Sequence, residues 1–390
     1  MWTILRRAFM VALALVAGGL FYLVYYHRTY HERIVSRELS ADGRGRVTIL
    51  SPTYLIDKIY PSMMGPYSNQ WALNLLERPK TTPKPAPELL WLTGIRTDLV
   101  APDGASPMSR EFFCHSNLVF TPEAVSPRRN DGTFTTMPSG RLFTLIPGRL
   151  EIKLPEGFGI PIYSDEPLDY FTMSLNLNYK EGLRKVRCRT AIDFMRDEAP
   201  AARDVKPLFR SCVLAYEPIG VASPHGICHG GSHPGAACGP FVGKAASSAF
   251  VASLGKTNTM HWLIPPGYYE SRVKVTDQLA VPYDTTAHYV TGHLHPYGKS
   301  LALVDATAKR TLFTVHAKDF NDRLGVAEME ELAFAKGVEL FKDHEYELVT
   351  VYENTTKEPI DAMSILYVYS LDKQFRPAPV LPGSVASAAK

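Results

Sequence analysis

Short apolar runs, separated by proline and glycine, make up most of the chain after residue 88. They lie at 89–92, 112–120, 142–150 and 170–177 in the first half, and at 261–264, 272–275, 287–295, 300–304, 311–316, 346–352 and 364–369 in the second. Runs of this length between turn residues are typical of antiparallel β-strands in sandwiches. One segment, 326–336, has helical spacing and good helix formers, so we predict a helix there.

The strand-rich region is interrupted at 218–243, which is rich in Gly, Pro and His. We expect this segment to be a loop between two domains. The fold class is therefore predicted to be all-β, with two tandem antiparallel β-sandwiches at 89–217 and 244–375 and a tail at 376–390. Residues 28–88 are predicted to be a linker that ends in a stiff, Pro-rich extension.

The N-terminal residues have a different pattern. Residues 8–26 are uncharged and apolar, follow Arg6 and Arg7, and end in Tyr25 and Tyr26. A helix of this length spans about 28 Å, close to the thickness of the hydrocarbon core of a bilayer. A cleaved signal peptide is the alternative interpretation. The length and the aromatic end favour a single transmembrane helix at 1–27 that carries both sandwiches.

Charge and cysteine content bear on the compartment and the partners. The basic start predicts a single-pass protein of the bacterial inner membrane, with its globular part in the periplasm. The formal net charge is only +3 and basic residues are not clustered, which argues against a nucleic-acid partner. Five cysteines fit an oxidising compartment. We expect a Cys228–Cys238 disulfide first and Cys188–Cys212 next, although other pairings stay open.

Two histidines one residue apart, His293 and His295, end the apolar run 287–295. Side chains at i and i+2 of a strand point to the same side, so both imidazoles are able to bind one metal ion. Pro296 and Gly298 should end the strand and leave the pair at its exposed end. Two ordinary surface histidines are the alternative.

A third ligand is suggested by Met363, which precedes the apolar run 364–369. A methionine at this position is usually core filler. Beside two histidines it would be a soft thioether ligand, and a His-His-Met set favours one copper ion, particularly Cu(I). The His-rich loop at 225–233 is a second candidate metal site, but Gly-rich loops rarely hold ligands in place.

These motifs resemble the type II, ascorbate-dependent copper monooxygenases, the family of peptidylglycine α-hydroxylating monooxygenase and dopamine β-monooxygenase. The resemblance lies first in His293 and His295, which are followed by Gly298-Lys299. It lies also in Asp361-Ala362-Met363, which precedes a strand with Tyr367 and Tyr369. Further matches are Ile264-Pro265-Pro266-Gly267, Leu154 to Gly159 and Tyr170-Phe171. It implies two jelly-roll-like sandwiches and a copper at His293, His295 and Met363.

The first half departs from this family. The resemblance implies a second copper, held there by three histidines of which two are adjacent. Here the adjacent pair is Cys114-His115, and the third position is Asn176, or Asn178 in a shifted register. Asparagine is a poor copper ligand. We therefore expect one copper site, and an electron that the second copper would supply must come from a reductant or a partner.

Three functions follow from this ligand inventory. The first is a copper-binding accessory or structural subunit of a bacterial membrane complex, respiratory or photosynthetic. The alternative is an active one-copper monooxygenase or oxidase that hydroxylates a small substrate with O₂, served by a redox partner. A copper chaperone or store is the third function and ranks last, because a chain of 390 residues is a large scaffold for carrying one ion.

Overall fold

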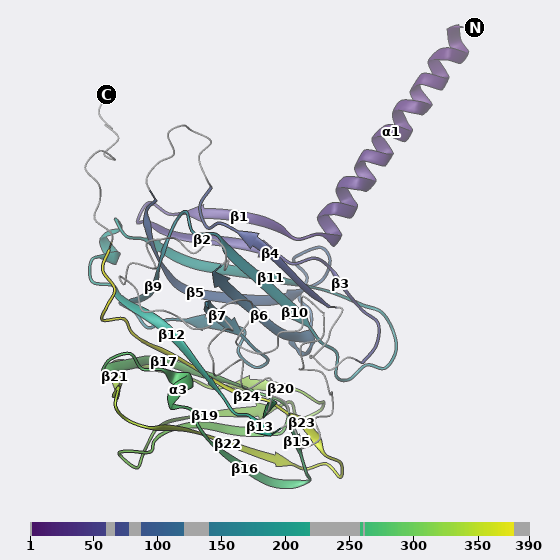
Figure 1. Ribbon diagram of the computed structural model, residues 1–390. Coiled ribbons are helices and arrows are strands. Elements are labelled where there is room, and N and C mark those ends of the chain that lie inside the picture. Colours follow the sequence, from purple (N-terminus) through teal and green to yellow (C-terminus); the bar gives the residue numbers. More distant parts are fainter. Residues whose placement is uncertain are drawn as a thin grey trace, which may run out of the picture.

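A computed structural model describes residues 2–59, 67–77, 87–120, 140–218, 258–259 and 262–377. This part of the chain is mostly β-structure in several sheets, and one long helix projects from it (Figure 1). The prediction of a β-protein is confirmed at this level. The Pro-rich segment 78–86, the segment predicted as a loop at 218–243 after its first residue, with Cys228 and Cys238, and the tail residues 378–390 lie outside the described residues.

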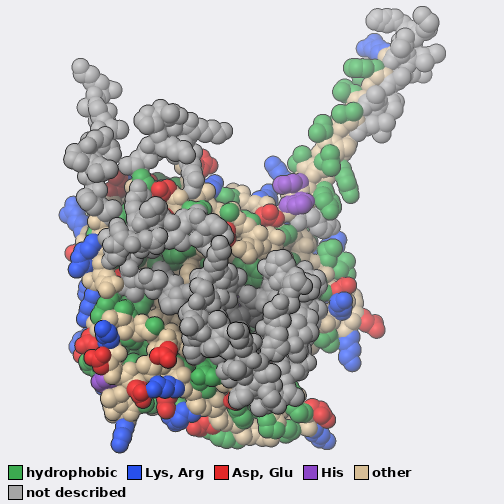
Figure 2. All heavy atoms as spheres, in the orientation of Figure 1, with side chains coloured by type: hydrophobic (Ala, Val, Ile, Leu, Met, Phe, Trp, Pro, Cys, Tyr) green, Lys and Arg blue, Asp and Glu red, His purple; other side chains and the backbone are tan. Residues whose placement is uncertain are grey.

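Helix α1 (Trp2–Tyr30) exposes apolar side chains along its described length (Figure 2). They include Phe9, Leu13, Val16, Leu20 and Phe21. The helix is joined to the β-region at its C-terminal end, where Arg187 donates hydrogen bonds of 2.7 Å to the carbonyl oxygens of Arg28 and His31. Among the residues whose side chains are described, no helix has both the length and the apolarity to cross a membrane.

One 11-stranded sheet runs through both halves of the chain (Figure 1). Its strands are, in spatial order, β1 (Arg33–Leu39), β2 (Arg44–Leu50), β11 (Arg184–Arg196), β5 (Leu89–Val100), β9 (Phe158–Tyr163), β12 (Lys206–Leu214), β24 (Ser364–Leu371), β17 (Thr285–Leu294) and β21 (Glu331–Leu340); β3 (Tyr54–Ile56) pairs with β11, and β8 (Glu151–Lys153) with β5. Strands β9 and β12 join in a short parallel contact, and the other pairs are antiparallel.

Two further sheets complete the layers. A four-stranded sheet has the order β4 (Ser68–Leu73), β10 (Leu168–Ser174), β6 (Phe113–Phe120) and β7 (Arg141–Leu145), and a five-stranded sheet has the order β16 (Gly267–Lys274), β22 (Tyr346–Asn354), β18 (Gly298–Asp305), β19 (Arg310–Asp319) and β20 (Val326–Met329). The small elements are β13 (Glu217–Pro218) with β14 (Asn258–Thr259), β15 (Trp262–Ile264) with β23 (Ile360–Ala362), η1 (Arg110–Phe112), η4 (Pro200–Ala202) and α3 (Thr276–Leu279).

Burial along the strands explains these layers. In β18, Leu301 and Leu303 are fully buried while Ala302 and Val304 are half-buried, the alternation of a strand with one face on a core. In β17 nearly every residue is buried, because the strand is covered on both faces. A single apolar cluster includes residues from both halves of the chain, so the two sheet systems share one core.

One predicted assignment is wrong. Residues 28–88 contain β1 to β4, and β2 pairs with β11 over seven positions, so this segment is part of the sheet and not only a linker. Strand β12, which lies in the predicted first sandwich, pairs with β9 of that region and with β24 near the C-terminus, so it connects the two predicted units. Sheet partners distant in sequence decide to which sheet a strand belongs.

The helix predicted at 326–336 is also wrong. Those residues form β20 and the first part of β21. Ala317 pairs with Met329, and Thr291 pairs with Glu331. Their intrinsic helix preference amounts to only tenths of a kcal/mol per residue, roughly 0 to 0.7, and pairing with two neighbouring strands overrides it.

The predicted Cys188–Cys212 disulfide is not formed. Cys114, Cys188 and Cys212 are buried and make no disulfide. Cys188 lies on β11 and Cys212 on β12, and two strands of the sheet separate them. Three strand spacings amount to about 14 Å, whereas a disulfide needs Cα atoms within about 7 Å. Burial raises the pKa of the Cys188 thiol to about 12, so it stays protonated.

Direct hydrogen bonds fix how the four-stranded sheet lies on the second half. Met329 N donates to the carbonyl oxygen of Gly148 at 3.0 Å, and Arg149 donates back to the carbonyl oxygen of Met329 through Nε at 2.9 Å and Nη2 at 2.6 Å. Nearby, Arg210 of β12 donates from Nη2 to the Thr144 hydroxyl at 2.8 Å. These contacts set the width of the space between the two halves.

Gly148 should tolerate no side chain. Its φ is +80°, and an added Cβ would lie 2.7 Å from backbone atoms of Glu328 and Met329. We expect Gly148→Ala to lower the free energy of unfolding by about 1–2 kcal/mol through the left-handed conformation, and by roughly 1–3 kcal/mol more through the clash. Chemical denaturation measures both.

Gly157→Ala is the matched control. Gly157 has a φ of +79° and nothing within 4 Å of an added Cβ, so its variant should show the conformational part alone. Equal midpoints for the two variants would mean that Gly148 does not form a tight junction.

Candidate metal site

The two predicted histidines lie together at the end of β17. His293 pairs with Ile365 of β24, and His295 follows the strand directly. Their ring centroids are 5.3 Å apart with an angle of 84° between the planes. Gly298 N donates to the carbonyl oxygen of His295 at 3.1 Å and closes the turn into β18. The backbone at the end of β17 therefore places the two imidazole rings next to each other, as the i, i+2 spacing predicts.

Met363 is held beside this pair by the hydroxyl of Tyr352, from β22. His295 N donates to the Tyr352 hydroxyl at 3.1 Å, and this hydroxyl donates to the carbonyl oxygen of Met363 at 2.7 Å. His295 N is also 3.3 Å from the Met363 oxygen. Met363 is 1% exposed, and burial raises the pKa of Tyr352, so the phenol remains a donor. One buried hydroxyl therefore ties together two strand ends distant in sequence.

Asp361 of β23 orients one imidazole. Its Oδ2 lies 2.9 Å from Nδ1 of His295, and both side chains are mostly buried. A carboxylate at this position favours the tautomer with the proton on Nδ1, which leaves the Nε2 lone pair available to a metal ion. This carboxylate–imidazole pairing is a common support for metal-binding histidines.

The opposite side of the site comes from the four-stranded sheet. Cys114 and His115 of β6, with Arg141 and Thr144 of β7, line a cavity of about 20 Å³. The other lining residues include His293, His295, Met363 and Tyr367. Burial, with a smaller effect of the Arg141 charge, lowers the pKa of His115 to about 3, so this imidazole is neutral. Cys114 and His115 thus face the two predicted histidines across one small cavity.

Asn176 and Asn178 both have structural roles. Asn176 Nδ2 donates to the carbonyl oxygens of Lys58 at 2.9 Å and Tyr179 at 2.7 Å, and its Oδ1 accepts from the backbone N of Tyr179 at 2.9 Å. These bonds hold a loop together. The expectation that Asn176 does not replace a metal-binding histidine agrees with this use of its polar atoms.

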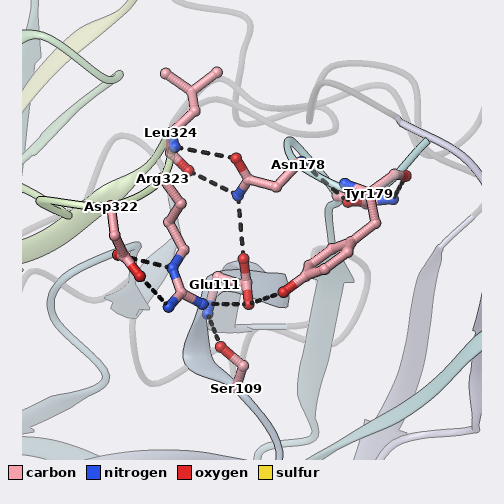
Figure 3. A network of polar contacts seen from close by, with 8 residues as sticks. Ser109, Glu111, Asn178, Tyr179, Asp322, Arg323 and Leu324 are labelled. Carbon is pink, nitrogen blue, oxygen red and sulfur yellow. Dashed lines mark hydrogen bonds and ion pairs between the residues drawn. The ribbon is translucent and has the colours of Figure 1, made fainter. Parts of the chain in front are cut away.

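Asn178 connects the two halves (Figure 3). It donates to and accepts from the backbone of Leu324, at 3.0 Å each, and donates to Oε2 of Glu111 at 3.1 Å. The buried Glu111 also accepts from Arg323 Nη1 at 2.9 Å and from the Tyr179 hydroxyl at 3.2 Å. The hydrogen bonds that Arg323 donates to Asp322, and then the negative charge of Glu111, raise the pKa of Arg323. This network fixes the loop before β20 against η1.

A larger cleft of about 210 Å³ opens beside the histidine pair. Its lining includes His293, His295 and Cys114, which also line the small cavity. The remaining wall is largely apolar and includes Phe113, Leu175, Leu177, Phe320, Leu324 and Val326. Arg110 and Glu111 also line the cleft. The two imidazoles are therefore reached through an apolar space.

The donor set fits copper better than a harder ion. Two imidazoles and one thioether are soft or borderline ligands, and an oriented His295 and a buried Met363 match that use. Within the described ranges, no cluster of three or more His, Cys, Asp or Glu side chains has an arrangement suited to a metal ion. A metal here consequently depends on the thioether of Met363 as its third ligand.

Several site residues were not identified from the sequence. Tyr352 reads as an ordinary strand tyrosine, and Arg141 as a surface residue beside a turn-rich segment. Only the tertiary structure shows that both are buried at the cavity. For Asp361 the signal was its position two residues before Met363.

Comparisons with known proteins do not identify the chain. No protein-family model and no curated protein match it. Among solved structures, the STIV MCP is similar with a TM-score of 0.28 and 7% identity, over 82% of this chain and 95% of that chain. PNGase F, a glycosylasparaginase from Flavobacterium meningosepticum, has a TM-score of 0.31 and 10% identity, over 86% and 97%. These scores are too low to carry an argument about fold or function.

Tyr352→Phe should loosen the site without removing a candidate ligand. The variant lacks the hydroxyl between His295 and Met363, and leaves buried backbone groups less well paired. We expect the free energy of unfolding to fall by about 1–3 kcal/mol, measured by chemical denaturation.

Tyr268→Phe is the control, because the Tyr268 side chain on β16 is exposed and bonds only to Glu270. It should change stability by less than about 0.5 kcal/mol. A similar small effect of Tyr352→Phe would show that its hydroxyl does not support the site.

Proposed function

We propose that this chain binds one copper ion through His293, His295 and Met363. The observation that carries the proposal is the Tyr352 hydroxyl, which holds the backbone of His295 and of Met363 together. The Asp361 carboxylate orients His295. Copper, when bound, would supply one-electron redox chemistry and reactivity toward O₂. The chain itself binds and orients the ion and limits the access of water.

The function that this geometry supports best is a one-copper monooxygenase or oxidase acting on a small, largely apolar molecule. The support is the apolar cleft of about 210 Å³, which shares His293 and His295 with the candidate copper site. A cleft of this kind beside converging polar groups is a typical binding site for a small organic ligand. Electrons would come from a small reductant or a redox partner, because Asn176 and Asn178 serve other roles.

A second candidate is an accessory or structural subunit of a bacterial membrane complex. The exposed apolar side chains of α1 favour it, since exposed apolar surface marks contact with a membrane or a partner. In this proposal α1 is the single-pass anchor and two jelly-roll-like sandwiches lie in the periplasm. The same helix would also anchor an enzyme, so the two candidates differ in activity and not in location.

Metal analysis of the purified chain tests the copper site. We expect one copper per chain, and its loss in His293→Ala and Met363→Ile. Asp361→Asn should lower copper affinity roughly 10- to 100-fold, because the carboxylate only supports His295.

The control for these variants is His316→Ala. His316 is exposed and pairs with Glu330, away from the site. Retained copper in His293→Ala would exclude the site, and two coppers per chain would mean that the first half also binds the ion.

Oxygen consumption separates the two candidates. With copper and ascorbate, an oxidase or monooxygenase should consume O₂ at a rate that His293→Ala abolishes. A chain that binds copper, consumes no O₂ and co-purifies from mild detergent in a larger assembly would be the accessory subunit. An active monomer would rule that subunit role out.

A further inference from the structure

The cavity of about 20 Å³ has two chemically different walls. One wall is formed by His293, His295 and Met363, the proposed copper ligands. The other is formed by Cys114 and His115 of β6 and by Arg141 of β7. A cavity of this size holds about one water-sized group. The residues of the second wall are not ligands in the proposed copper site.

His115 presents a buried polar atom to this cavity. The residue is 8% exposed, and its Nε2 has no hydrogen-bond partner among the described residues. Its Nδ1 lies 3.0 Å from Sγ of Cys114, and its ring packs on Phe171 with centroids 5.3 Å apart. With the Cys114 thiol as donor to Nδ1, the ring proton of His115 lies on Nε2, and this is the tautomer that we assign to His115. A buried N–H group without an acceptor is costly, so it favours an acceptor in the cavity.

Arg141 adds a positive charge to the same wall. Its side chain is almost fully buried, and its Nη1 donates to Oδ1 of Asn117 at 3.1 Å. Asn117 Oδ1 also accepts from the Thr144 hydroxyl at 2.8 Å, and Thr144 accepts from the buried Arg210. This chain of bonds holds the guanidinium in place.

We propose that His115 and Arg141 bind a small monovalent anion, about the size of chloride, beside the copper ion. This inference rests on the proposed copper site, since the anion would lie between the ion and the donor wall. Charged donors make stronger hydrogen bonds to an anion than to a neutral acceptor. The small volume of about 20 Å³ favours a compact anion over a carboxylate, a phosphate or a sulfate.

Coulomb attraction supports the same assignment. An anion that lies between a bound copper ion and the Arg141 guanidinium is attracted by both. Copper and the anion should therefore bind cooperatively, each raising the affinity of the other by the same factor.

The test is a chloride titration of the copper(II)-loaded full chain, followed by its optical charge-transfer band and its electron paramagnetic resonance spectrum. His115→Phe keeps a ring against Phe171 but has no N–H group, and should weaken chloride binding roughly 10- to 100-fold. Arg141→Lys keeps the charge with fewer donors and should weaken it less. His316→Phe is the control at an exposed histidine and should bind chloride like the unmodified chain. Acetate should bind at least about tenfold more weakly than chloride because of its size.

Two results would overturn the inference while leaving the copper site intact. One is a copper-loaded chain that binds no chloride, or binds it equally well in His115→Phe. The other is weaker copper binding by His115→Phe without chloride, which would make Nε2 a metal ligand. If the chain takes up no copper, the proposed function fails, and chloride binding is then measured on the metal-free chain by chloride-35 line broadening. Chloride binding that becomes weaker in His115→Phe would support the anion site, and the absence of chloride binding would reject it.

Discussion

The antiparallel pairing of β17 with β24 is the contact on which the rest of the structure depends. It joins residues far apart in sequence, with His293 opposite Ile365. Strand β24 then pairs with β12, which leads through β9 into the first half, so one sheet continues across the chain. Both strands are buried on their two faces. The candidate site lies at the end of the strand pair β17 and β24, and it is held in place by the pairing of these two strands.

Polar groups at this strand end are arranged by buried hydrogen bonds and not by loops alone. Tyr352 connects His295 to Met363, and Asp361 orients the imidazole. Buried groups of this kind are costly when unpaired, so each one restricts its partner. The opposite wall follows the same rule through Arg141, Asn117 and Thr144. The two walls are connected by the hydrogen bonds of Gly148 and Arg149 with Met329.

The predominance of β-structure and the side-by-side placement of the two histidines were accessible from the sequence because both depend on local pattern. Short apolar runs between turn residues predict strands such as β18, and an i, i+2 spacing places two imidazoles on one side of a strand. Strand membership was not accessible in the same way. Residues 28–88 were assigned to a linker and residues 326–336 to a helix, because partners distant in sequence decide pairing and override weak local preferences.

The sequence by itself therefore determined a β-protein with an apolar N-terminal segment and a candidate ligand set of His293, His295 and Met363. The tertiary structure alone decided that Tyr352 joins these ligands, that Asn176 and Asn178 are used in loop and inter-half contacts, and that His115 and Arg141 face the same cavity. The physical reason is that hydrogen-bond partners and burial are properties of the packed sheets, whereas residue type and spacing are properties of the chain.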